Sequence, residues 1–313
     1  MSSPLLETER TYLRPFRPED ADGLFELHQA EEISRFTKDR PFPDREAALE
    51  FITHYDHYQK YGLGRWAVIH KGNEEFLGWC GLHYDPGSRK IDLGYRLIKR
   101  FWGQGLASET ARAVLDHAFD QMHYPVLWAH AHVDNVASQR ILEKLGFQKK
   151  MQRSDEGVPI FTYRIANPDY AFKRISALET YPVRHPVLRE GQPYEKARME
   201  ADDLDTTTHY GAYYQDQLVG VATLMLDTHP DFKGEQCRLR GMAVLPEFRK
   251  RGIAEMLLQL GIEDYVQKGC DLLWFNARIG AVSFYQKLSF EIHGELFDIP
   301  DIGAHYVMKK TIP

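Results

Sequence analysis

A glycine-rich turn between a strand pattern and a helix pattern occurs twice in this chain, and this repeat constrains the fold more than any other feature. The first copy, residues 100–105, reads Arg-Phe-Trp-Gly-Gln-Gly, and the second, residues 249–254, reads Arg-Lys-Arg-Gly-Ile-Ala. A helical pattern follows each copy. The leading arginines lie 149 positions apart, and this register pairs Gly103 with Gly252.

Such a turn suits a phosphate group. A strand that feeds a turn at a helix start points several backbone N–H groups at one spot, and small residues let a ligand approach the main chain. The helix N-terminus also favours anions. We therefore infer a pyrophosphate ligand, to which four basic side chains would add charge: Arg100, Arg249, Lys250 and Arg251. A single copy would equally fit glycines that only shape a turn, whereas the repeat favours a binding site.

The sequence context after each turn is repeated as well. Beyond the first helix pattern come an apolar strand pattern, Asn-Val-Ala-Ser at 135–138 and Leu-Gly-Phe at 145–147. Beyond the second come an apolar strand pattern and Tyr-Gln-Lys-Leu-Ser-Phe at 285–290. This order resembles the GNAT superfamily of N-acyltransferases over nearly the whole chain. The resemblance implies an α/β fold of the α+β mixed-sheet type, with two tandem GNAT domains that each have a mostly antiparallel central sheet flanked by helices.

The two halves resemble different branches of that family. The first contains Leu-Gly-Tyr-Arg-Leu at 93–97 and resembles the ribosomal-protein (Rim-type) alanine N-acetyltransferases. The second contains Asn-Ala-Arg at 276–278 and resembles the ElaA-type acetyltransferases. An Asn-Pro-Asp sequence at 167–169 interrupts the pattern between them. We therefore expect an N-terminal domain over 1–168 and a C-terminal domain over 174–313, joined by fusion rather than by recent duplication.

Composition argues against several other classes of protein. A length of 313 residues suits two domains, each of which can build a core from a chain that is 43% hydrophobic. The formal charge of −6 and the pI near 6.2 argue against nucleic acid as an electrostatic partner. No signal peptide or membrane span is indicated, and Cys80, Cys237 and Cys270 fit neither a disulfide framework nor a zinc site. We expect a cytoplasmic protein with no nucleic-acid or membrane partner, and a homodimer stays open.

Two helical stretches are predicted between the first strands, at about 19–36 and 44–61. By resemblance, this segment walls the acceptor pocket, so its aromatic residues are candidate pocket residues, although core packing is the alternative. These residues are Phe36, Phe42, Tyr55 and Tyr58.

The resemblance implies acetyl-CoA as co-substrate and an amine as acceptor. The expected acetyl-CoA contacts are the end of the strand, the turn, the helix start and two asparagines. Asn135 would hold the pantetheine amides, with a turn or helix-cap role as the alternative. In the first half these positions are Leu97, Ile98, Arg100, Gly103, Gln104, Gly105, Leu106, Ala107 and Asn135. In the second half they are Met242, Ala243, Val244, Arg249, Lys250, Arg251, Gly252, Ile253, Ala254 and Asn276.

Transfer of an acyl group from a thioester also needs donors for the oxyanion and an acid for the leaving thiolate. Backbone N–H groups near Leu97 and Val244 would stabilise the oxyanion. The family's usual acid is a tyrosine, here Tyr285, whose alternative role is core packing. The matching residue of the first half, Leu142, cannot donate a proton. We name Ser138 as the substitute donor there, and a missing acid would cost about 10²-fold because a thiolate with a pKa near 8.5 is a tolerable leaving group.

The acceptor amine must lose a proton, since a primary alkyl amine has a pKa near 10.4. Asp92 is a candidate base in the first half, and Glu200 or His209 in the second. All three also fit ordinary surface or loop groups. His130 and His132 point to one face of a strand but lack a third ligand nearby in sequence, so we expect no metal site.

Two functions therefore stay open at the level of sequence. The leading interpretation is an N-acetyltransferase that moves an acetyl group from acetyl-CoA to an amine of a peptide N-terminus or small molecule. The alternative is an acyl-CoA-binding regulatory or scaffold protein in which one or both domains are catalytically silent. Tyr285 and the two turns favour the enzyme, whereas Leu142 favours the alternative for the first half.

Overall fold

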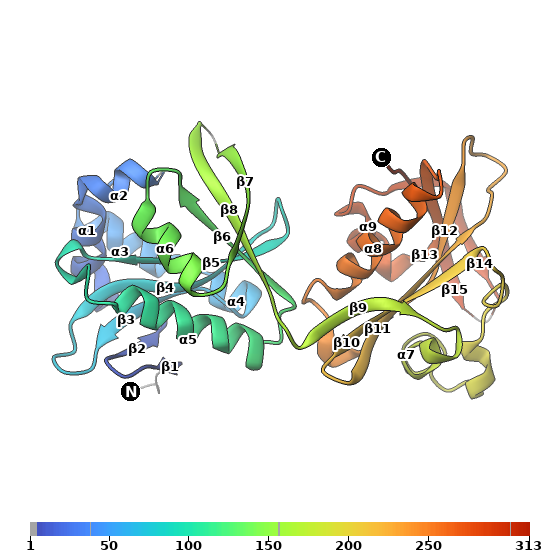
Figure 1. Ribbon diagram of the computed structural model, residues 1–313, viewed down its shortest axis with the longest axis horizontal. Helices are drawn as coiled ribbons and strands as arrows, with labels where there is room; N and C mark the ends of the chain where they lie inside the picture. Colours follow the sequence, from blue (N-terminus) through green and yellow to red (C-terminus); the bar gives the residue numbers. More distant parts are fainter. Residues whose placement is uncertain (1–4, 38, 156, 301) are drawn as a thin grey trace. The chain divides into compact units, whose positions relative to one another are not determined.

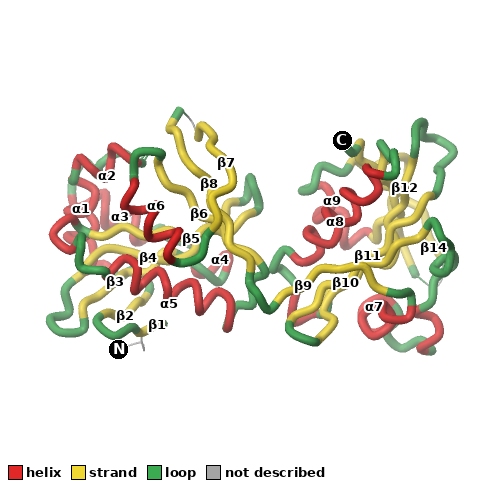
Figure 2. The backbone as a smooth tube through the Cα atoms, viewed as in Figure 1, coloured by secondary structure: helices red, strands yellow, loops and turns green. Residues whose placement is uncertain are grey.

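The computed structural model describes residues 5–37, 39–155, 157–300 and 302–313, with the side chains of 32–34 left aside. The chain divides into two compact units, Met1–Asn167 and Pro168–Pro313, each of which contains one sheet (Figures 1 and 2). Helices flank each sheet, and most neighbouring strands run antiparallel. This arrangement confirms the predicted class of two α/β domains with mixed, mostly antiparallel sheets.

In the first unit the described strands form one sheet in the order β1-β2-β3-β4-β5-β6-β8-β7. The strands are β1 (Leu6–Glu7), β2 (Thr11–Arg14), β3 (Arg65–His70), β4 (Phe76–Asp85), β5 (Lys90–Leu97), β6 (Val126–His132), β7 (Gln148–Asp155) and β8 (Val158–Ala166). The helices are α1 (Ala21–Gln29), α2 (Glu31–Phe36), α3 (Arg45–Thr53), α4 (His57–Tyr61), α5 (Leu106–Asp120) and α6 (Val136–Lys144). Helices α5 and α6 pack into the larger core, whereas α1 and α3 share a second core cluster.

In the second unit the order is β14-β15-β13-β12-β11-β10-β9. The strands are β9 (Tyr170–Ile175), β10 (Thr207–Tyr214), β11 (Gln217–Leu226), β12 (Gln236–Val244), β13 (Leu272–Arg278), β14 (Glu291–Ile299) and β15 (Gly303–Thr311). The helices are α7 (Tyr181–Leu188), α8 (Ile253–Gln267) and α9 (Val282–Gln286). Helix α8 belongs to the main core and α7 to a smaller cluster, and Figure 1 shows them on different sides of the sheet.

Helices α5 and α8 follow the two glycine turns, and each is 15 residues long. Their buried residues recur every three or four positions, which places one apolar stripe against the sheet. In α8 the stripe includes Gly261, where a Cβ atom would lie only 2.6 Å from Leu224. The small residue thus permits close packing of helix and sheet, and this packing fixes the helix N-terminus beside the turn.

Local structure departs from the sequence prediction in two places. The expected helices over 19–36 and 44–61 are each broken: Ala30 is extended between α1 and α2, and residues 54–56 separate α3 from α4. Residues 169–173, placed before the start of the expected second domain at 174, lie largely in β9. That strand pairs with β10 and so belongs to the second sheet.

Candidate active sites

In each unit, two parallel central strands separate from one another. Among the described residues, β5 and β6 pair only where Asp92 lies opposite Trp128. Strands β12 and β13 pair as far as Arg238 and Trp274. Beyond these pairs β5 and β12 run on toward the glycine turns, and their backbone groups on the side of β6 and β13 are left without a strand partner. An open wedge of this kind allows a ligand to bond to the main chain.

The glycine turns correspond in a register that differs from the sequence pairing. Gly105 is the residue before α5 and has φ +78°, and Gly252 is the residue before α8 and has φ +83°. Two positions earlier, Gly103 has φ +75° and Lys250 has φ +61°. Gly105 therefore corresponds to Gly252, 147 positions away. The pairing of Gly103 with Gly252 is wrong by two positions.

A side-chain contact explains why matching the arginines misled the alignment. Trp102 donates its indole N–H to the carbonyl oxygen of Leu97 at 2.7 Å. Arg249 donates its Nε–H to the equivalent carbonyl oxygen, that of Val244, at 3.1 Å. A tryptophan and an arginine therefore hold the same turn by the same bond, and only their positions in the fold reveal the match.

Both helix N-termini are accessible at the turn glycines. A Cβ atom at Gly252 would meet no atom within 4 Å, and one at Gly105 would meet only Arg10 Nη2, at 3.6 Å. A ligand can therefore approach the main chain there. Leu106 and Ile253, the first residues of α5 and α8, are buried in the cores, so only their backbone groups can face a ligand.

The basic residues at the first turn differ from those expected. Arg100 is already paired with two carboxylates, Glu26 and Glu75, the latter at 2.8 Å. Arg10, from the loop before β2, is also paired, with Glu109 at 2.6 Å, but it lies closer to the turn glycine and donates to the carbonyl oxygen of Gln104 at 2.9 Å. Sequence reasoning missed Arg10 because it is remote in the chain from the turn that it reaches.

At the second turn, the charge comes from the expected residues. Lys250 is exposed, and Arg251 lies over the ring of Phe248 at 5.1 Å. The Nη1 atom of Arg251 is buried without a hydrogen-bond partner. Arg251 also interacts with Tyr170 of β9, so Lys250 is the more exposed cation at this turn.

A pocket of about 230 Å³ lies at the first wedge. Of the predicted residues, it brings together Asp92, Asn135, Ser138 and Leu142. The full lining is Phe36, Thr37, Arg65, Trp79, Asp92, Leu93, Gly94, Tyr95, Arg96, His130, Ala131, His132, Asn135, Ser138 and Leu142. The pocket therefore joins strand residues of β5 and β6 to the first turns of α6.

A hydroxyl pair spans this first pocket. The hydroxyl of Tyr95, on β5, lies 3.0 Å from Ser138 Oγ and donates to the carbonyl oxygen of Ser138 at 3.1 Å. Burial raises the pKa of Tyr95 above its usual value, so the phenol keeps its proton. Asn135 caps α6 by accepting from the Ser138 N–H at 3.0 Å, which leaves its amide N–H groups available. The sequence drew attention to Ser138 but not to Tyr95.

Asp92 is held in an ion pair rather than free to act as a base. Arg65 lies 2.5 Å from one carboxylate oxygen, and His83 Nδ1 lies 3.2 Å from the other. Burial would raise the pKa of Asp92, but the Arg65 charge and the bonds from His83 and Arg65 lower it well below its usual range. Such a carboxylate accepts a proton poorly. Gly94 serves the same pair, since a Cβ there would lie 2.8 Å from the Arg65 guanidinium.

A pocket of about 240 Å³ lies at the second wedge. Of the predicted residues, it brings together Met242, Asn276 and Tyr285. The full lining is Leu188, Arg189, Met199, Arg238, Leu239, Arg240, Gly241, Met242, Phe275, Asn276, Ala277, Arg278, Ala281, Tyr285, Ile299, Ile302 and His305. Met242 stands where the first unit has Tyr95, again 147 positions apart.

Tyr285 lies in α9 at the edge of this pocket, and 8% of its surface is exposed. Its ring packs against Phe275 with a centroid distance of 4.3 Å. Burial raises the pKa of Tyr285, so the hydroxyl remains protonated at neutral pH. Within the described part of the chain, this hydroxyl makes no hydrogen bond. Its counterpart Leu142 lines the first pocket. The described lining of each pocket therefore includes one tyrosine, which is Tyr95 on strand β5 in the first unit and Tyr285 on helix α9 in the second.

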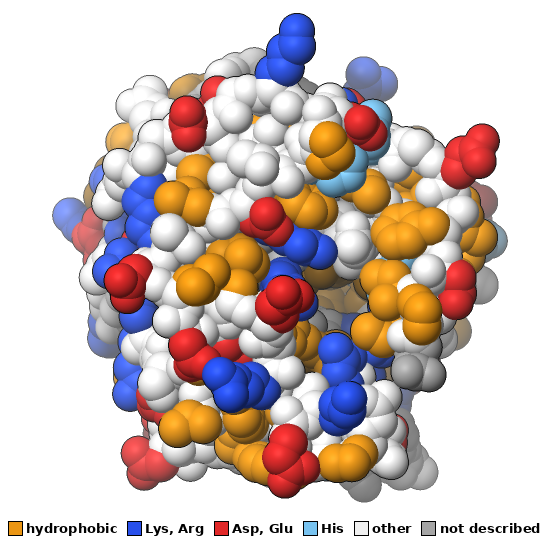
Figure 3. Space-filling model, turned by 90° about the vertical axis from the view of Figure 1, so that its right-hand side faces the viewer, with side chains coloured by type: hydrophobic (Ala, Val, Ile, Leu, Met, Phe, Trp, Pro, Cys, Tyr) orange, Lys and Arg blue, Asp and Glu red, His pale blue; other side chains and the backbone are white. Residues whose placement is uncertain are grey.

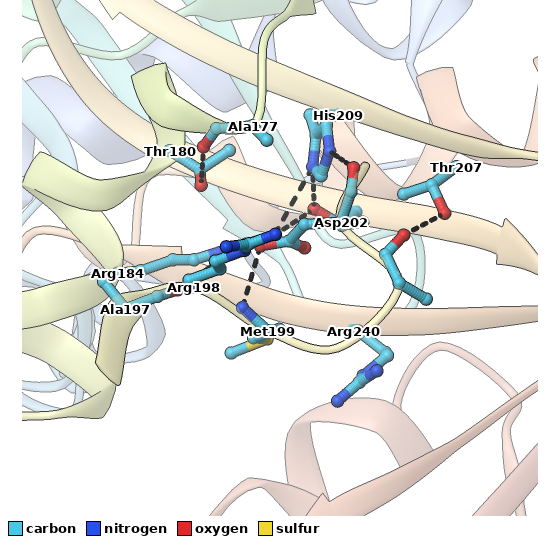
Figure 4. Close-up of polar contacts among 12 residues, drawn as sticks. Ala177, Thr180, Arg184, Ala197, Arg198, Met199, Asp202, Thr207, His209 and Arg240 are labelled. Carbon is cyan, nitrogen blue, oxygen red and sulfur yellow. Dashed lines mark hydrogen bonds and ion pairs between the residues drawn. The ribbon is translucent and has the colours of Figure 1, made fainter. Parts of the chain in front are cut away.

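The two candidate bases of the second unit lie outside its pocket lining. His209 is buried, with Nδ1 2.7 Å from Thr223 Oγ1 and Nε2 2.9 Å from the carbonyl oxygen of Asp202. Both of its nitrogens are therefore occupied. Figure 4 shows it beside the buried ion pair of Arg184 and Asp202, which is 2.6 Å long. Glu200 is exposed, and its backbone carbonyl oxygen accepts from the pocket residue Arg240 at 2.7 Å.

The four aromatic residues expected at the acceptor pocket fall into two pairs. Phe36 lines the first pocket, and Phe42 lines an adjoining one. Tyr55 and Tyr58 instead bond to the backbone of Arg65 through their hydroxyls.

No cluster of three or more possible metal ligands occurs among the residues described. Over the same residues, no helix is long and apolar enough to cross a membrane.

Comparison with known proteins identifies the family. Residues 10–148 match the model of the acetyltransferase (GNAT) domain, and residues 172–290 match that of the acetyltransferase (GNAT) family. The uncharacterized N-acetyltransferase YitI of Bacillus subtilis is 34% identical over 141 residues, which are 45% of this chain and 95% of that protein. This chain belongs to the GNAT acetyltransferases.

A second relative and a solved structure are similar to parts of this GNAT protein. The uncharacterized N-acetyltransferase YoaA of Bacillus subtilis is 31% identical over 150 residues, 47% of this chain and 84% of that protein. An acetyltransferase structure from Agrobacterium tumefaciens covers 53% of this chain and 95% of its own, at 26% identity and a TM-score of 0.46. Membership makes the protein an N-acetyltransferase with acetyl-CoA as acetyl donor.

Proposed function

We propose that the second domain carries out the faster acetyl transfer, with Tyr285 as the acid that protonates the departing sulfur. The acceptor is an amine of a peptide N-terminus or a small molecule. The observation that carries this proposal is the Tyr285 hydroxyl, which borders the wedge pocket without a hydrogen-bond partner among the described residues. The neutral phenol can hydrogen-bond to the departing sulfur and transfer its proton as the C–S bond breaks.

The donor molecule would be held at the glycine turns and along the wedges. In the second domain, backbone N–H groups at Gly252 and the exposed Lys250 suit its pyrophosphate, while Asn276 lines the wedge. In the first domain, Gly105 corresponds to Gly252, and Asn135 lies at the start of α6 rather than in the strand that precedes it. When bound, acetyl-CoA supplies the acetyl thioester, and the chain supplies position, charge and a proton.

In the first domain we propose that Tyr95 and Ser138 together replace the missing tyrosine. Leu142 cannot donate a proton from α6, but the Tyr95 hydroxyl reaches the wedge from β5 and lies 3.0 Å from the Ser138 hydroxyl of α6. This pair can relay a proton to a sulfur placed beside it. Asp92, fixed by Arg65, is better suited to shape the pocket than to remove a proton.

Among the described residues, the proton-accepting groups that line the two pockets are histidines and the ion-paired Asp92, and such weak bases favour amines that are neutral near pH 7.5. An α-amino group has a pKa of about 7.7–8.0, against about 10.4 for a lysine-type amine. A peptide N-terminus therefore needs less help to lose its proton, which supports it as an acceptor of the first domain. The three cysteines are free and buried, and this fits a reducing, cytoplasmic compartment.

An acetyl-transfer screen tests the function. The full chain is incubated with acetyl-CoA and peptides, polyamines or amino-sugar compounds in turn, and free thiol is measured alongside the mass of the acetylated product. We expect amine-dependent release of thiol that Tyr285→Phe lowers. Thiol release that no amine increases, from protein shown to bind acetyl-CoA, would instead support the binding-only alternative.

A further inference from the structure

The pocket of the second domain combines apolar side chains with four arginines. Arg189, Arg238, Arg240 and Arg278 all line it, and none of its lining residues that the structure describes is an Asp or Glu. Figure 3 shows a face with a hollow near its centre, beside which lie lysine or arginine side chains and hydrophobic ones. A partly buried charge is costly without a counter-charge, so a pocket of this composition favours an anion.

The four arginines differ in how far their charge is already satisfied. Arg238 forms an ion pair with Asp227 at 2.9 Å. Arg240, in contrast, donates to a neutral acceptor, the carbonyl oxygen of Glu200, at 2.7 Å. Figure 4 shows the Arg240 guanidinium turned away from Asp202. Arg240 therefore offers a charged, forked donor with N–H groups left over, the geometry that suits a carboxylate or a phosphate.

Arg189 and Arg278 also lack a carboxylate partner in the described part of the chain. Both donate to one oxygen, the carbonyl of Leu188, at 2.9 Å and 3.0 Å. Burial and then the nearby charge of Arg278 lower the pKa of Arg189, as expected for like charges close together. An anion between them would relieve this repulsion.

These arginines lie on a different face of the sheet from the pyrophosphate turn. Leu239 packs into the core cluster that contains α8, so its strand neighbours Arg238 and Arg240 project from the opposite face. That face carries α7, since a Cβ at Gly241 would lie 2.7 Å from Arg184 Nε. The turn at Gly252, in contrast, opens α8. The pyrophosphate of the donor and the anion at the arginines therefore call for separate sites.

We propose that the acceptor of the second domain is a small amine that also carries an oxyanion, a carboxylate or a phosphate, which Arg240 and Arg278 hold. This rests on the proposed function, because the same pocket contains Tyr285, the acid of that reaction. The oxyanion end would bind at the arginines, and the amine would then point toward the wedge. The arginines also repel polycations, so polyamines are poor acceptors of this domain.

Matched pairs of amines test the class of acceptor on the full chain. Glycine is compared with glycinamide, and phosphoethanolamine with ethanolamine, with spermidine as the cationic case. The anionic member of each pair is the more basic amine, so kcat/KM is calculated from the concentration of unprotonated amine. We expect this value to be at least about 10-fold higher for the anionic member of one pair, and the pair that shows it distinguishes carboxylate from phosphate. Equal kcat/KM values within both pairs would overturn the proposal.

Arginine variants then locate the effect. Arg240→Gln and the more exposed Arg278→Gln should each raise the KM for the anionic amine by about 10- to 100-fold and leave the Kd of acetyl-CoA unchanged. Arg198→Gln is the matched control, because Arg198 is an exposed arginine paired with Asp203. If both pocket variants instead weaken only acetyl-CoA, the arginines serve the donor and the proposal is wrong.

A binding measurement separates this proposal from the proposed function. Calorimetry with succinate and with inorganic phosphate needs no turnover. Binding of either anion that Arg240→Gln and Arg278→Gln weaken supports the oxyanion site even if every amine fails in the screen. Absence of anion binding together with active, unselective acetyl transfer would refute the oxyanion site and leave the enzyme assignment intact.

Discussion

Replacement of Tyr285 by phenylalanine separates a catalytic hydroxyl from a packing residue. The ring lies 4.3 Å from that of Phe275 and is retained in the variant. The hydroxyl has no hydrogen-bond partner among the described residues, so its removal should change the free energy of unfolding by less than about 1 kcal/mol, the net value of one hydrogen bond. Loss of a general acid should nonetheless lower turnover roughly 100-fold, which corresponds to about 2.7 kcal/mol of barrier.

Tyr265→Phe provides the matched control. The Tyr265 hydroxyl is buried in the same unit and lies 2.8 Å and 2.6 Å from the carbonyl oxygens of Thr206 and Leu224. Its removal should cost about 1–3 kcal/mol of stability and leave turnover per folded molecule unchanged. Thermal melts and thiol release are measured on both variants with saturating acetyl-CoA. Full turnover by Tyr285→Phe, or unfolding comparable to that of Tyr265→Phe, would refute Tyr285 as the acid.

Three further results are expected. Ser289 has φ +64° where the first unit has a glycine, so Ser289→Gly should raise stability by about 1 kcal/mol, and a lower melting temperature would contradict this. Tyr95→Phe, made in the Tyr285→Phe background, should lower the residual turnover about 100-fold, and unchanged residual turnover would exclude Tyr95. Burial and the Arg96 charge lower the pKa of His28 from 6.5 to about 4. The unfolded chain therefore binds more protons between these values, and stability is lost as the pH falls from 6.5 toward 4; His28→Gln should flatten that part of the melting profile.

The sequence carried enough information to predict the fold. Each half contains the same order of elements: strand, turn, helix and a final Leu-Gly-Phe or Leu-Ser-Phe segment. Each element can be recognised from neighbouring residues, through glycine conformation or the period of apolar residues. The same local reasoning misaligned the two turns, because it matched the arginines of residues 100 and 249. The bond that Trp102 makes to Leu97 has the same role as the bond from Arg249 to Val244, but that likeness exists only in three dimensions.

The candidate sites were predictable only where the functional groups lie near the motifs. Tyr285 and Ser138 were found in this way, and both line wedge pockets. Tyr95 was missed because its partner Ser138 is distant in sequence. The sequence around Asp92 does not indicate its pairing with Arg65, which lies on β3 on the far side of β4. This pairing lowers the proton affinity of Asp92.

The arginines of the second pocket were missed for the same reason. They come from β12, from the end of β13 and from the residue after α7, and no sequence pattern joins these segments. The start of the second domain could not be placed from the sequence either, because it depends on the pairing of two strands. Residues 169–173 were left between the two expected domains, but residues 170–175 form β9, which completes the edge of the second sheet by pairing with β10.

The central claim is that each glycine turn binds one acetyl-CoA, and the number of sites on the full chain tests it most directly. Aspartate tolerates a left-handed backbone and places a negative charge where a phosphate would lie. Gly62→Asp and Gly269→Asp are matched controls, since these glycines also have positive φ, of +70° and +90°, and open space around them.

Calorimetry with acetyl-CoA should give two sites for the unaltered chain and for both controls. It should give one site for Gly105→Asp, one for Gly252→Asp, and none when both changes are combined. Two sites that survive in the double variant, or a single site in the unaltered chain that Gly252→Asp leaves in place, would contradict the account.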